Sequence, residues 1–322
     1  MTLPAFTKEQ CETAKVLLAS RVAYMMGRKL EEGDWAHVYC KTLGIRVPEW
    51  SNLNADLTIP GLSLEHKMMR CSESQPIQDH CGTDMMHPAL TRRVSLPEKV
   101  GADEAMRIVI AGYQRVLDER LAKAAALSKG RPVELRSGWL LYESSLSEFL
   151  YWEEPTVNLN PKEHKAVWKE RVALGEGGRR ANKNLWIYNK ATGRKVWSVT
   201  GGRSGTKIQP YFTVPAADDE NLCYFRVQGE PWAGDTVRVW VTEPTARTLR
   251  EVLGDLQTGH LSEAILNASA KATTLASTED HERVHELVIL QTAYLALKEK
   301  FPGVSDEHCF QLLCKRLVEK AR

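Results

Sequence analysis

The sequence contains no apolar run near the roughly 18 residues needed to cross a bilayer, so a membrane-spanning helix is excluded. Residues 1–8 lack the basic and then apolar pattern of a secretory signal. The seven cysteines are odd in number and irregularly spaced, which argues against a disulfide framework and is typical of a reducing compartment. We therefore expect a cytoplasmic protein with no membrane partner.

Motifs for several common chemistries are also missing. There is no glycine-rich phosphate loop of the P-loop or dinucleotide-binding type, so we expect no nucleotide cofactor. No arrangement of nucleophile and base is recognisable. Four possible zinc ligands fall within seventeen residues, but none forms a C-x₂-C pair and the adjacent His-Cys is poor chelate spacing: Cys71, His80, Cys81 and His87. Zinc stays a minor alternative.

The most informative segment that is present spans residues 54–70. Its Pro60-Gly61 pair predicts a type II turn, because proline presets the first central position and glycine tolerates the positive φ of the second. The flanking apolar residues then pair across a β-hairpin, Ile59 with Leu62 and Leu57 with Leu64. The same register places Asp56 directly opposite Glu65.

Two carboxylates placed opposite one another repel, so something must offset the repulsion. Residues i and i+2 of a strand share a face, which brings Lys67 to the side of Glu65 and Asp56. The opposite face of the strand carries the apolar side chains and one histidine: Leu62, Leu64, His66 and Met68. Such a carboxylate pair suits Mg²⁺, which is bound by one or two carboxylates together with substrate phosphate oxygens. Lys67 then positions or deprotonates an attacking water.

This spacing resembles the PD-(D/E)xK nuclease superfamily, which includes most type II restriction endonucleases. The resemblance rests on Asp56, Glu65 and Lys67 and on their hairpin. It implies that Asp56 and Glu65 hold a divalent metal and that Lys67 assists the water. Ala55 stands where the proline that names the motif would be, a position that varies among relatives.

Many members of that superfamily add a glutamate from the helix before the hairpin. Glu31 or Glu32 is in place for this role, and we assign Glu32 to the metal beside Asp56 and Glu65. The alternative is a surface hairpin with incidental acids, since this spacing alone often occurs by chance. The apolar flanks favour a buried strand over that alternative.

Positive charge is concentrated in one stretch of a nearly neutral chain. Residues 162–207 hold twelve Lys and Arg against three Glu, a net +9 in a protein whose total is +2. Such a concentration is expected of a surface that contacts a phosphate backbone, although a solvated basic face gives the same pattern. The side chains that we expect to contact DNA are Arg179, Arg180, Lys183, Arg194, Lys195, Arg203 and Lys207.

Aromatic residues interrupt the same stretch. Trp186, Tyr188 and Trp197 alternate with aliphatic residues on a predicted hairpin. Stacking on nucleotides and packing into a core are the two alternatives, and packing is the commoner use of strand aromatics.

The order of elements indicates an α/β (α+β) fold with a core of restriction-endonuclease type. We expect helices at 7–30 and 102–128 around the hairpin, with strands at 139–142 and 149–152. Residues 1–155 would form this catalytic core. Residues 156–243 would form a basic β-rich region that contacts DNA.

The remaining residues, 244–322, are expected to form a helical lobe for dimerisation or for embracing DNA. The predicted helices cover 244–256, 261–275, 281–301 and 305–321. Cutting both strands of a duplex with one metal site per chain favours a homodimer.

Together these patterns predict a Mg²⁺-dependent type II restriction endonuclease that hydrolyses phosphodiester bonds in double-stranded DNA. Whether methylated cytosine is required stays open. The alternatives are a repair or recombination nuclease acting on branched DNA and a DNA-binding protein without enzymatic activity. The recognition sequence and the cleavage stagger depend on geometry that spacing does not reveal.

Overall fold

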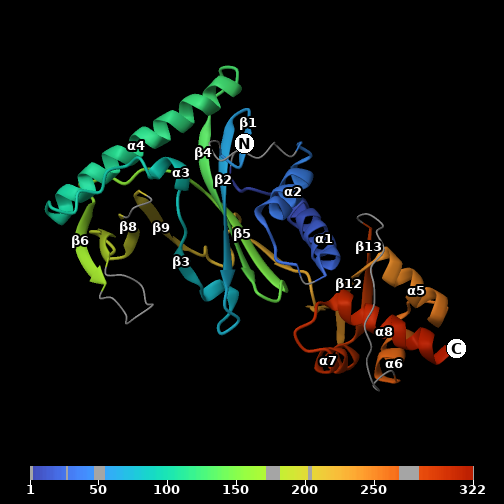
Figure 1. The fold of residues 1–322 in the computed structure, drawn as a ribbon. Coiled ribbons are helices and arrows are strands. Elements are labelled where there is room, and N and C mark those ends of the chain that lie inside the picture. Colours follow the sequence, from blue (N-terminus) through green and yellow to red (C-terminus); the bar gives the residue numbers. More distant parts are fainter. Residues whose placement is uncertain are drawn as a thin grey trace.

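The computed structural model describes residues 3–26, 28–46, 55–171, 182–201, 205–267 and 283–321. Three β-sheets and their helices form a mixed α+β fold (Figure 1). Of the expected DNA-contacting residues, Arg179, Arg180 and Arg203 lie outside the described residues. No helix in the described part of the chain is both long and apolar enough to cross a membrane.

The first sheet carries the predicted hairpin. Its strands follow one another in space as β1 (Leu57–Ile59), β2 (Leu62–Cys71), β4 (Glu134–Glu143), β5 (Glu148–Pro155) and β10 (Cys223–Arg226). Strands β2 and β4 are parallel, and the other neighbours are antiparallel. A parallel pair needs a long crossover, which here includes α4 (Ala102–Leu127).

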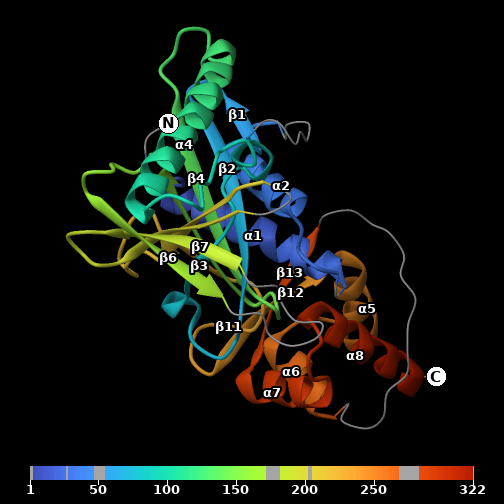
Figure 2. The same cartoon turned by 60° about the vertical axis from the view of Figure 1, so that its left-hand side comes forward.

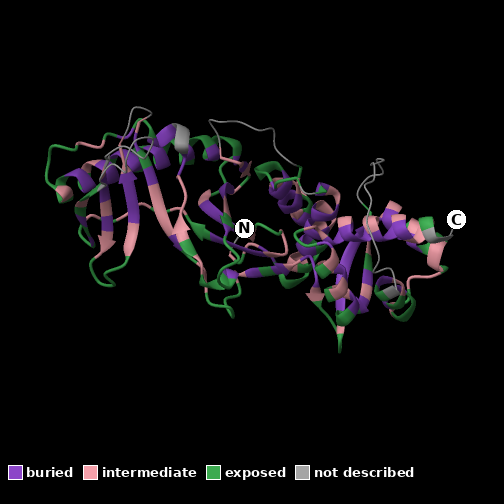
Figure 3. Cartoon of the chain, turned by 60° about the horizontal axis from the view of Figure 1, so that its bottom comes forward, coloured by how far each residue is buried: buried purple, intermediate pink, exposed green. Residues whose placement is uncertain are grey.

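Helices α1 (Lys8–Met25) and α2 (Glu32–Leu43) cover one face of this sheet. Thr7 and Gln10 form a capping box at the start of α1. The core on this face joins aliphatic residues of β2 to aromatic residues of α2, among them Leu64 and Trp35. Buried positions run along the strands and the facing sides of the helices, whereas exposed positions gather at turns (Figure 3).

The second sheet packs against the buried stripe of α4. Its antiparallel strands are ordered β3 (Cys81–Thr83), β9 (Lys207–Thr213), β8 (Lys195–Thr200), β7 (Asn182–Asn189) and β6 (His164–Arg171). Tyr113 of α4 meets Trp197 of β8 edge to face, with ring centroids 5.1 Å apart. A short 3₁₀ helix, Ile77–Asp79, and helix α3 (Pro88–Thr91) connect the two sheets.

The C-terminal unit has strands as well as helices. Strands β11 (Glu230–Pro231), β12 (Thr236–Thr242) and β13 (Val284–Leu290) form a third sheet. The accompanying helices are α5 (Glu243–Leu253), α6 (Thr258–Asn267), α7 (Gln291–Lys300) and α8 (Asp306–Ala321). They gather around β12 and β13 at the end of the molecule opposite β6 and β7, in both Figure 1 and Figure 2.

The expectation of a purely helical lobe is therefore wrong. The helix predicted at 281–301 begins only at Gln291, and Val284–Leu290 is a strand that pairs with β12 along its whole length. Leu287 and Ile289 of this strand point into the apolar core of the unit. Without β13 as its partner, the buried strand β12 would leave backbone N–H and C=O groups unpaired. The free-energy cost of these unpaired groups outweighs the helical propensity of Leu287 and Leu290.

The packing also crosses the expected boundaries at 155 and 243. Strand β10 follows the second sheet in sequence but pairs with β5 of the first sheet. A disulfide between Cys11 and Cys223 links α1 to this strand, with Cα atoms 6.1 Å apart. The number and spacing of the cysteines argued against a disulfide framework, and this one bridge is a departure from that expectation. The sequence does not indicate this pairing, because the two cysteines are 212 residues apart.

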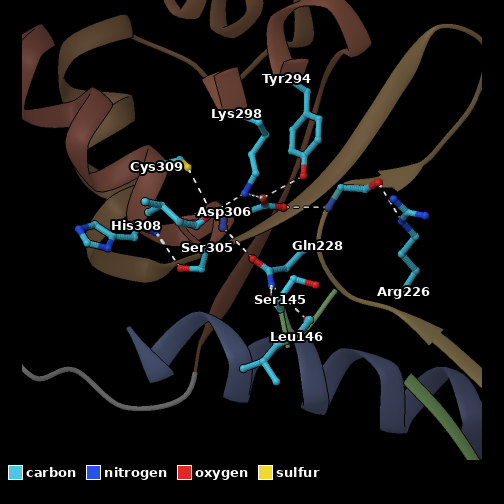
Figure 4. A network of polar contacts seen from close by, with 12 residues as sticks. Ser145, Leu146, Arg226, Gln228, Tyr294, Lys298, Ser305, Asp306, His308 and Cys309 are labelled. Atoms are coloured by element: carbon cyan, nitrogen blue, oxygen red, sulfur yellow. Dashed lines mark hydrogen bonds and ion pairs between the residues drawn. The ribbon is translucent and has the colours of Figure 1, made fainter. Parts of the chain in front are cut away.

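A buried polar network fastens the C-terminal unit to the first sheet (Figure 4). Gln228 donates from Nε2 to the carbonyl of Ser145, at 2.7 Å, in the turn between β4 and β5. Its Oε1 accepts the backbone N–H of Asp306 at 2.8 Å. The carboxylate of Asp306 accepts the backbone N–H of Gly229 at 2.8 Å. One amide side chain and one carboxylate thus connect two packing units.

Candidate functional site

The hairpin has the predicted register. Leu57 lies opposite Leu64, and Ile59 lies opposite Leu62. Gly61 has a φ of +90°, close to that of the second central position of a type II turn. Asp56 comes directly before β1, so the local turn chemistry sets the position of the first predicted acid.

The two faces of β2 also divide as predicted. Leu62 and Leu64 join the core under α1 and α2, and the ring of His66 lies 4.9 Å from that of Tyr39. Burial, against the opposing charge of Glu65, lowers the pKa of His66 to about 3, so this histidine is neutral. Glu65 and Lys67 point to the opposite face, toward α4.

Three basic groups surround the carboxylate of Glu65. Lys67 Nζ lies 3.0 Å from Oε1, and Arg120 Nη1 lies 2.8 Å from Oε2. Nδ1 of His87 lies 3.3 Å from the same Oε2. All four side chains are less than 10% exposed. Burial alone would raise the pKa of Glu65, but the contact with His87 and the charges of Lys67 and Arg120 hold this pKa well below its usual range.

Helix α4 and helix α3 deliver the two basic groups that the sequence did not reveal. Arg120 belongs to the buried stripe of α4, where it follows Tyr113, Val116 and Leu117 at helical spacing. His87 is the N-cap of α3, and its ring stacks on that of Tyr113 with centroids 6.1 Å apart. The sequence feature that could have identified Arg120 as a buried site residue is its position as a charged side chain within an apolar stripe of helical spacing. The sequence shows no comparable signal for His87.

Asp56 has a different environment from Glu65. Its Oδ2 accepts the backbone N–H of His66 at 2.7 Å. Burial, and after it the negative charge of Glu65, raises the pKa of Asp56 to about 7. The charge of Glu32, an exposed residue at the start of α2, raises it further. The repulsion expected between the paired carboxylates is therefore present, and it acts mainly on Asp56.

The chemistry of the candidate ligands suits Mg²⁺, but the carboxylate of Glu65 is already paired with basic side chains. Asp56 and Glu65 supply the carboxylate oxygens that this cation prefers. Both oxygens of Glu65, however, are already paired with cations. Within the described ranges, no group of three or more His, Cys, Asp and Glu side chains is arranged to hold a metal ion. The expected set of Asp56, Glu65 and Glu32 is thus not gathered around one point.

The zinc alternative finds no support in the positions of its four candidates. Cys71 is buried and Cys81 is exposed, at opposite ends of the connection between β2 and β3. His80 Nε2 contacts the carbonyl oxygen of Ser72 at 2.9 Å. His87 lies beside Glu65, so the four side chains do not converge on one zinc site.

The described basic residues of the DNA-contact prediction lie on the second sheet or next to it. Lys183 stacks 4.6 Å above Trp168, whereas Lys195 lies 3.6 Å from the ring centroid of Trp186. Arg194 and Lys207 are exposed at strand ends. The same sheet divides the three aromatic residues noted in the sequence, because Trp197 is buried whereas Trp186 and Tyr188 are only half-buried.

Comparisons with protein-family models, with curated proteins and with solved structures find nothing that matches the chain. Its candidate site is therefore interpreted from its own residues.

Proposed function

We propose that the chain is a Mg²⁺-dependent endonuclease of type II restriction type, with a core like that of the PD-(D/E)xK nucleases, acting on double-stranded DNA as a homodimer. The observation that carries the proposal is the hairpin, in which Lys67 pairs with Glu65 and the charge of Glu65 raises the pKa of Asp56. The order of hairpin, crossover helix and parallel strand supports it as well.

In this proposal Asp56 and Glu65 hold the cation and Lys67 positions the attacking water. A bound Mg²⁺ would polarise the scissile phosphate and stabilise the leaving oxygen. Lys67 already lies within hydrogen-bond distance of Glu65, so its ammonium is held beside the proposed ligands. Glu65 has to exchange Arg120 for the cation. Arg120 then becomes free to pair with a DNA phosphate, an oxyanion that matches its planar fork.

The raised pKa of Asp56 is consistent with a ligand position. A partly buried carboxylate beside a second carboxylate binds a proton more readily than a free one, and a cation can replace that proton as the compensating charge. The neutral His66 on the opposite face takes no part in this chemistry, since its ring packs among aromatic residues.

A second candidate is a DNA-binding protein whose acids are structural. The ion pairs around Glu65 favour it, because a carboxylate held by Lys67, Arg120 and His87 resembles a buried structural anchor. The basic residues of the second sheet fit both candidates equally.

Cleavage assays separate the candidates. Methylated and unmethylated plasmids and a four-way junction are incubated with the protein in Mg²⁺ or in EDTA. We expect discrete fragments that need Mg²⁺ and disappear in Lys67→Ala, whereas Lys123→Ala, a change at an exposed lysine of α4, keeps them. Cutting of junctions alone would indicate a repair nuclease. Tight DNA binding without any cutting would establish the second candidate.

A further inference from the structure

The outer face of the second sheet combines aromatic rings with lysines. Residues that lie opposite one another on neighbouring strands point to the same face, and the registers pair Lys165 with Tyr188 and Lys169 with Asn184. In β7 the alternate residues Leu185 and Ile187 are buried against α4. The side of the sheet that carries Trp186 and Tyr188 is therefore turned away from α4.

The neighbouring strands continue this face. Ser198 of β8 lies opposite Trp186 and also opposite Gln209 of β9. Lys207 and Tyr211 share the side of Gln209, because they are two residues before and after it in the same strand. We call this surface the outer β6–β9 face. Its described side chains are basic, aromatic, amide, hydroxyl or aliphatic, with no Asp or Glu among them.

Lysine ammonium groups lie over the aromatic rings. Lys195 Nζ is 3.6 Å from the ring centroid of Trp186 and 4.2 Å from that of Tyr211. Lys169 Nζ lies 5.7 Å from the same Trp186 ring. Lys169 is exposed and Lys195 is half-buried, so both ammonium groups can leave the rings for a phosphate without losing a buried contact. A cation–π contact at such a site is weaker than a base stacked on an aromatic ring.

We propose that the outer β6–β9 face binds single-stranded nucleic acid, with bases stacked on Trp186 and Tyr211 and phosphates paired with Lys169, Lys195 and Lys207. A stacking platform flanked by cations without acids is complementary to unpaired bases on a negatively charged backbone. A duplex hides its base faces in its own stack, so it would use the lysines and leave the rings without a role. The amide of the half-buried Gln209 adds a hydrogen-bond partner for base edges.

This inference rests on the nucleic-acid contact of the proposed function and not on its cleavage step. It assigns a single-stranded portion to the substrate, in addition to the duplex or in its place. Arg120 belongs to α4 and pairs with Glu65, whereas the outer β6–β9 face is turned away from α4, so binding at the face can be altered without touching the candidate site.

The test measures binding in EDTA, where cleavage plays no part. A fluorescein-labelled oligothymidylate of about 20 nucleotides, longer than typical single-strand binding sites, is titrated with the full chain while anisotropy is recorded. The probe is compared with an abasic strand of the same length, which has phosphates and no bases, and with a duplex of the same length. We expect the oligothymidylate to bind about tenfold or more tightly than the abasic strand, because each lost base–aromatic stack weakens binding by a factor of that order.

The variants isolate the rings. Trp186→Ala and Tyr211→Ala should each weaken oligothymidylate binding by about fivefold or more and leave abasic-strand binding nearly unchanged. Trp232→Ala is the matched control, because Trp232 is another tryptophan under a cation, Arg238 at 3.8 Å, but it lies in the C-terminal unit. It should leave both affinities unchanged. Trp186→Phe keeps a stacking ring and should restore most of the affinity lost in Trp186→Ala.

Three results would overturn the inference. Equal affinity for the abasic strand and the oligothymidylate would show a purely electrostatic surface. Weakening of duplex binding by Trp186→Ala as large as the weakening of oligothymidylate binding would assign the face to double-stranded DNA. A loss of affinity in Trp232→Ala as large as in Trp186→Ala would place the contact elsewhere. Failure of the cleavage assay alone leaves all of these measurements interpretable.

Discussion

Arg120 of α4 donates from Nη1 to Oε2 of Glu65 on β2 across 2.8 Å. This ion pair joins two segments 55 residues apart, and both side chains are less than 10% exposed. Glu65 is consequently both an anchor of the fold and the central acid of the proposed site. The two roles compete for the same two oxygens, which makes them separable by mutation.

The anchoring role predicts a large stability cost for Glu65→Gln. The change leaves Arg120 and Lys67 buried without a counter-charge, and removing one partner of a buried pair costs about 3 kcal/mol or more. Urea unfolding followed by circular dichroism gives the free energy of unfolding. The control is Glu119→Gln, since Glu119 pairs with Arg93 on the surface and should cost less than about 1 kcal/mol. Similar costs for the two variants would show that Glu65 is not an anchor.

The metal-binding role predicts a different result for Arg120→Met. Methionine fills a similar volume without charge, so Glu65 keeps only Lys67 and His87 as partners and is freer to accept a cation. We expect MgCl₂ to raise the melting temperature of Arg120→Met more than that of the unmodified chain, because a ligand that binds only the folded state stabilises it. The double variant Arg120→Met/Glu65→Gln should lose this response. Equal Mg²⁺ responses in all three proteins would exclude Glu65 as a metal ligand.

The environment of Asp56 predicts a pH dependence of stability without any metal. Its pKa is raised to about 7 by burial and by Glu65, whereas an unfolded aspartate titrates near pH 3.9. Between these values the folded chain keeps a proton that the unfolded chain has released, so the free energy of unfolding falls as pH rises from about 4 to about 7. Asp56→Asn cannot lose that proton, and its stability should decline less over this window. Urea midpoints from pH 4 to pH 7 in EDTA measure the difference. Parallel curves for the two proteins would contradict the assigned environment.

The hairpin was predictable because its determinants are local. The Pro60-Gly61 turn sets the register, and the register sets which face carries Glu65 and which carries His66. The partners of Glu65 were not predictable in the same way. Arg120 and His87 reach it only after α4 and α3 have packed, and no spacing within the sequence encodes that approach.

In the C-terminal unit, secondary structure depends on pairing between segments that are far apart in the sequence. Val284–Leu290 is predicted to be helical and is a strand, because β12 supplies a partner that lies more than forty residues earlier in the chain. The return of β10 to the first sheet is non-local in the same sense. Sequence patterns predicted the local elements of this unit, and long-range strand pairing determined whether a predicted helix is a helix or a strand in the structure.

The junction in Figure 4 carries the last prediction, a stability cost for Asp306→Asn. The buried Asp306 carboxylate accepts hydrogen bonds from the Gly229 backbone N–H at 2.8 Å and the Tyr294 hydroxyl at 3.1 Å, and Lys298 Nζ lies 3.3 Å away. An asparagine has the same shape but one acceptor fewer and no charge, so one donor loses its partner. Hydrogen bonds to a charged group contribute about 1.5 to 3 kcal/mol, and we expect a loss of that size in the free energy of unfolding.

A matched control and a second measurement make this prediction specific to the junction. Glu299→Gln removes an exposed acid from α7 beside the same network and should cost well under about 1 kcal/mol. Because Asp306 and Gln228 connect the C-terminal unit to the turn between β4 and β5, limited proteolysis of Asp306→Asn should release the C-terminal unit sooner than it does from the unmodified chain. Cleavage at the same rate in both proteins, together with an unchanged urea midpoint, would show that the apolar contacts between α1 and β12 hold the two units together without this network.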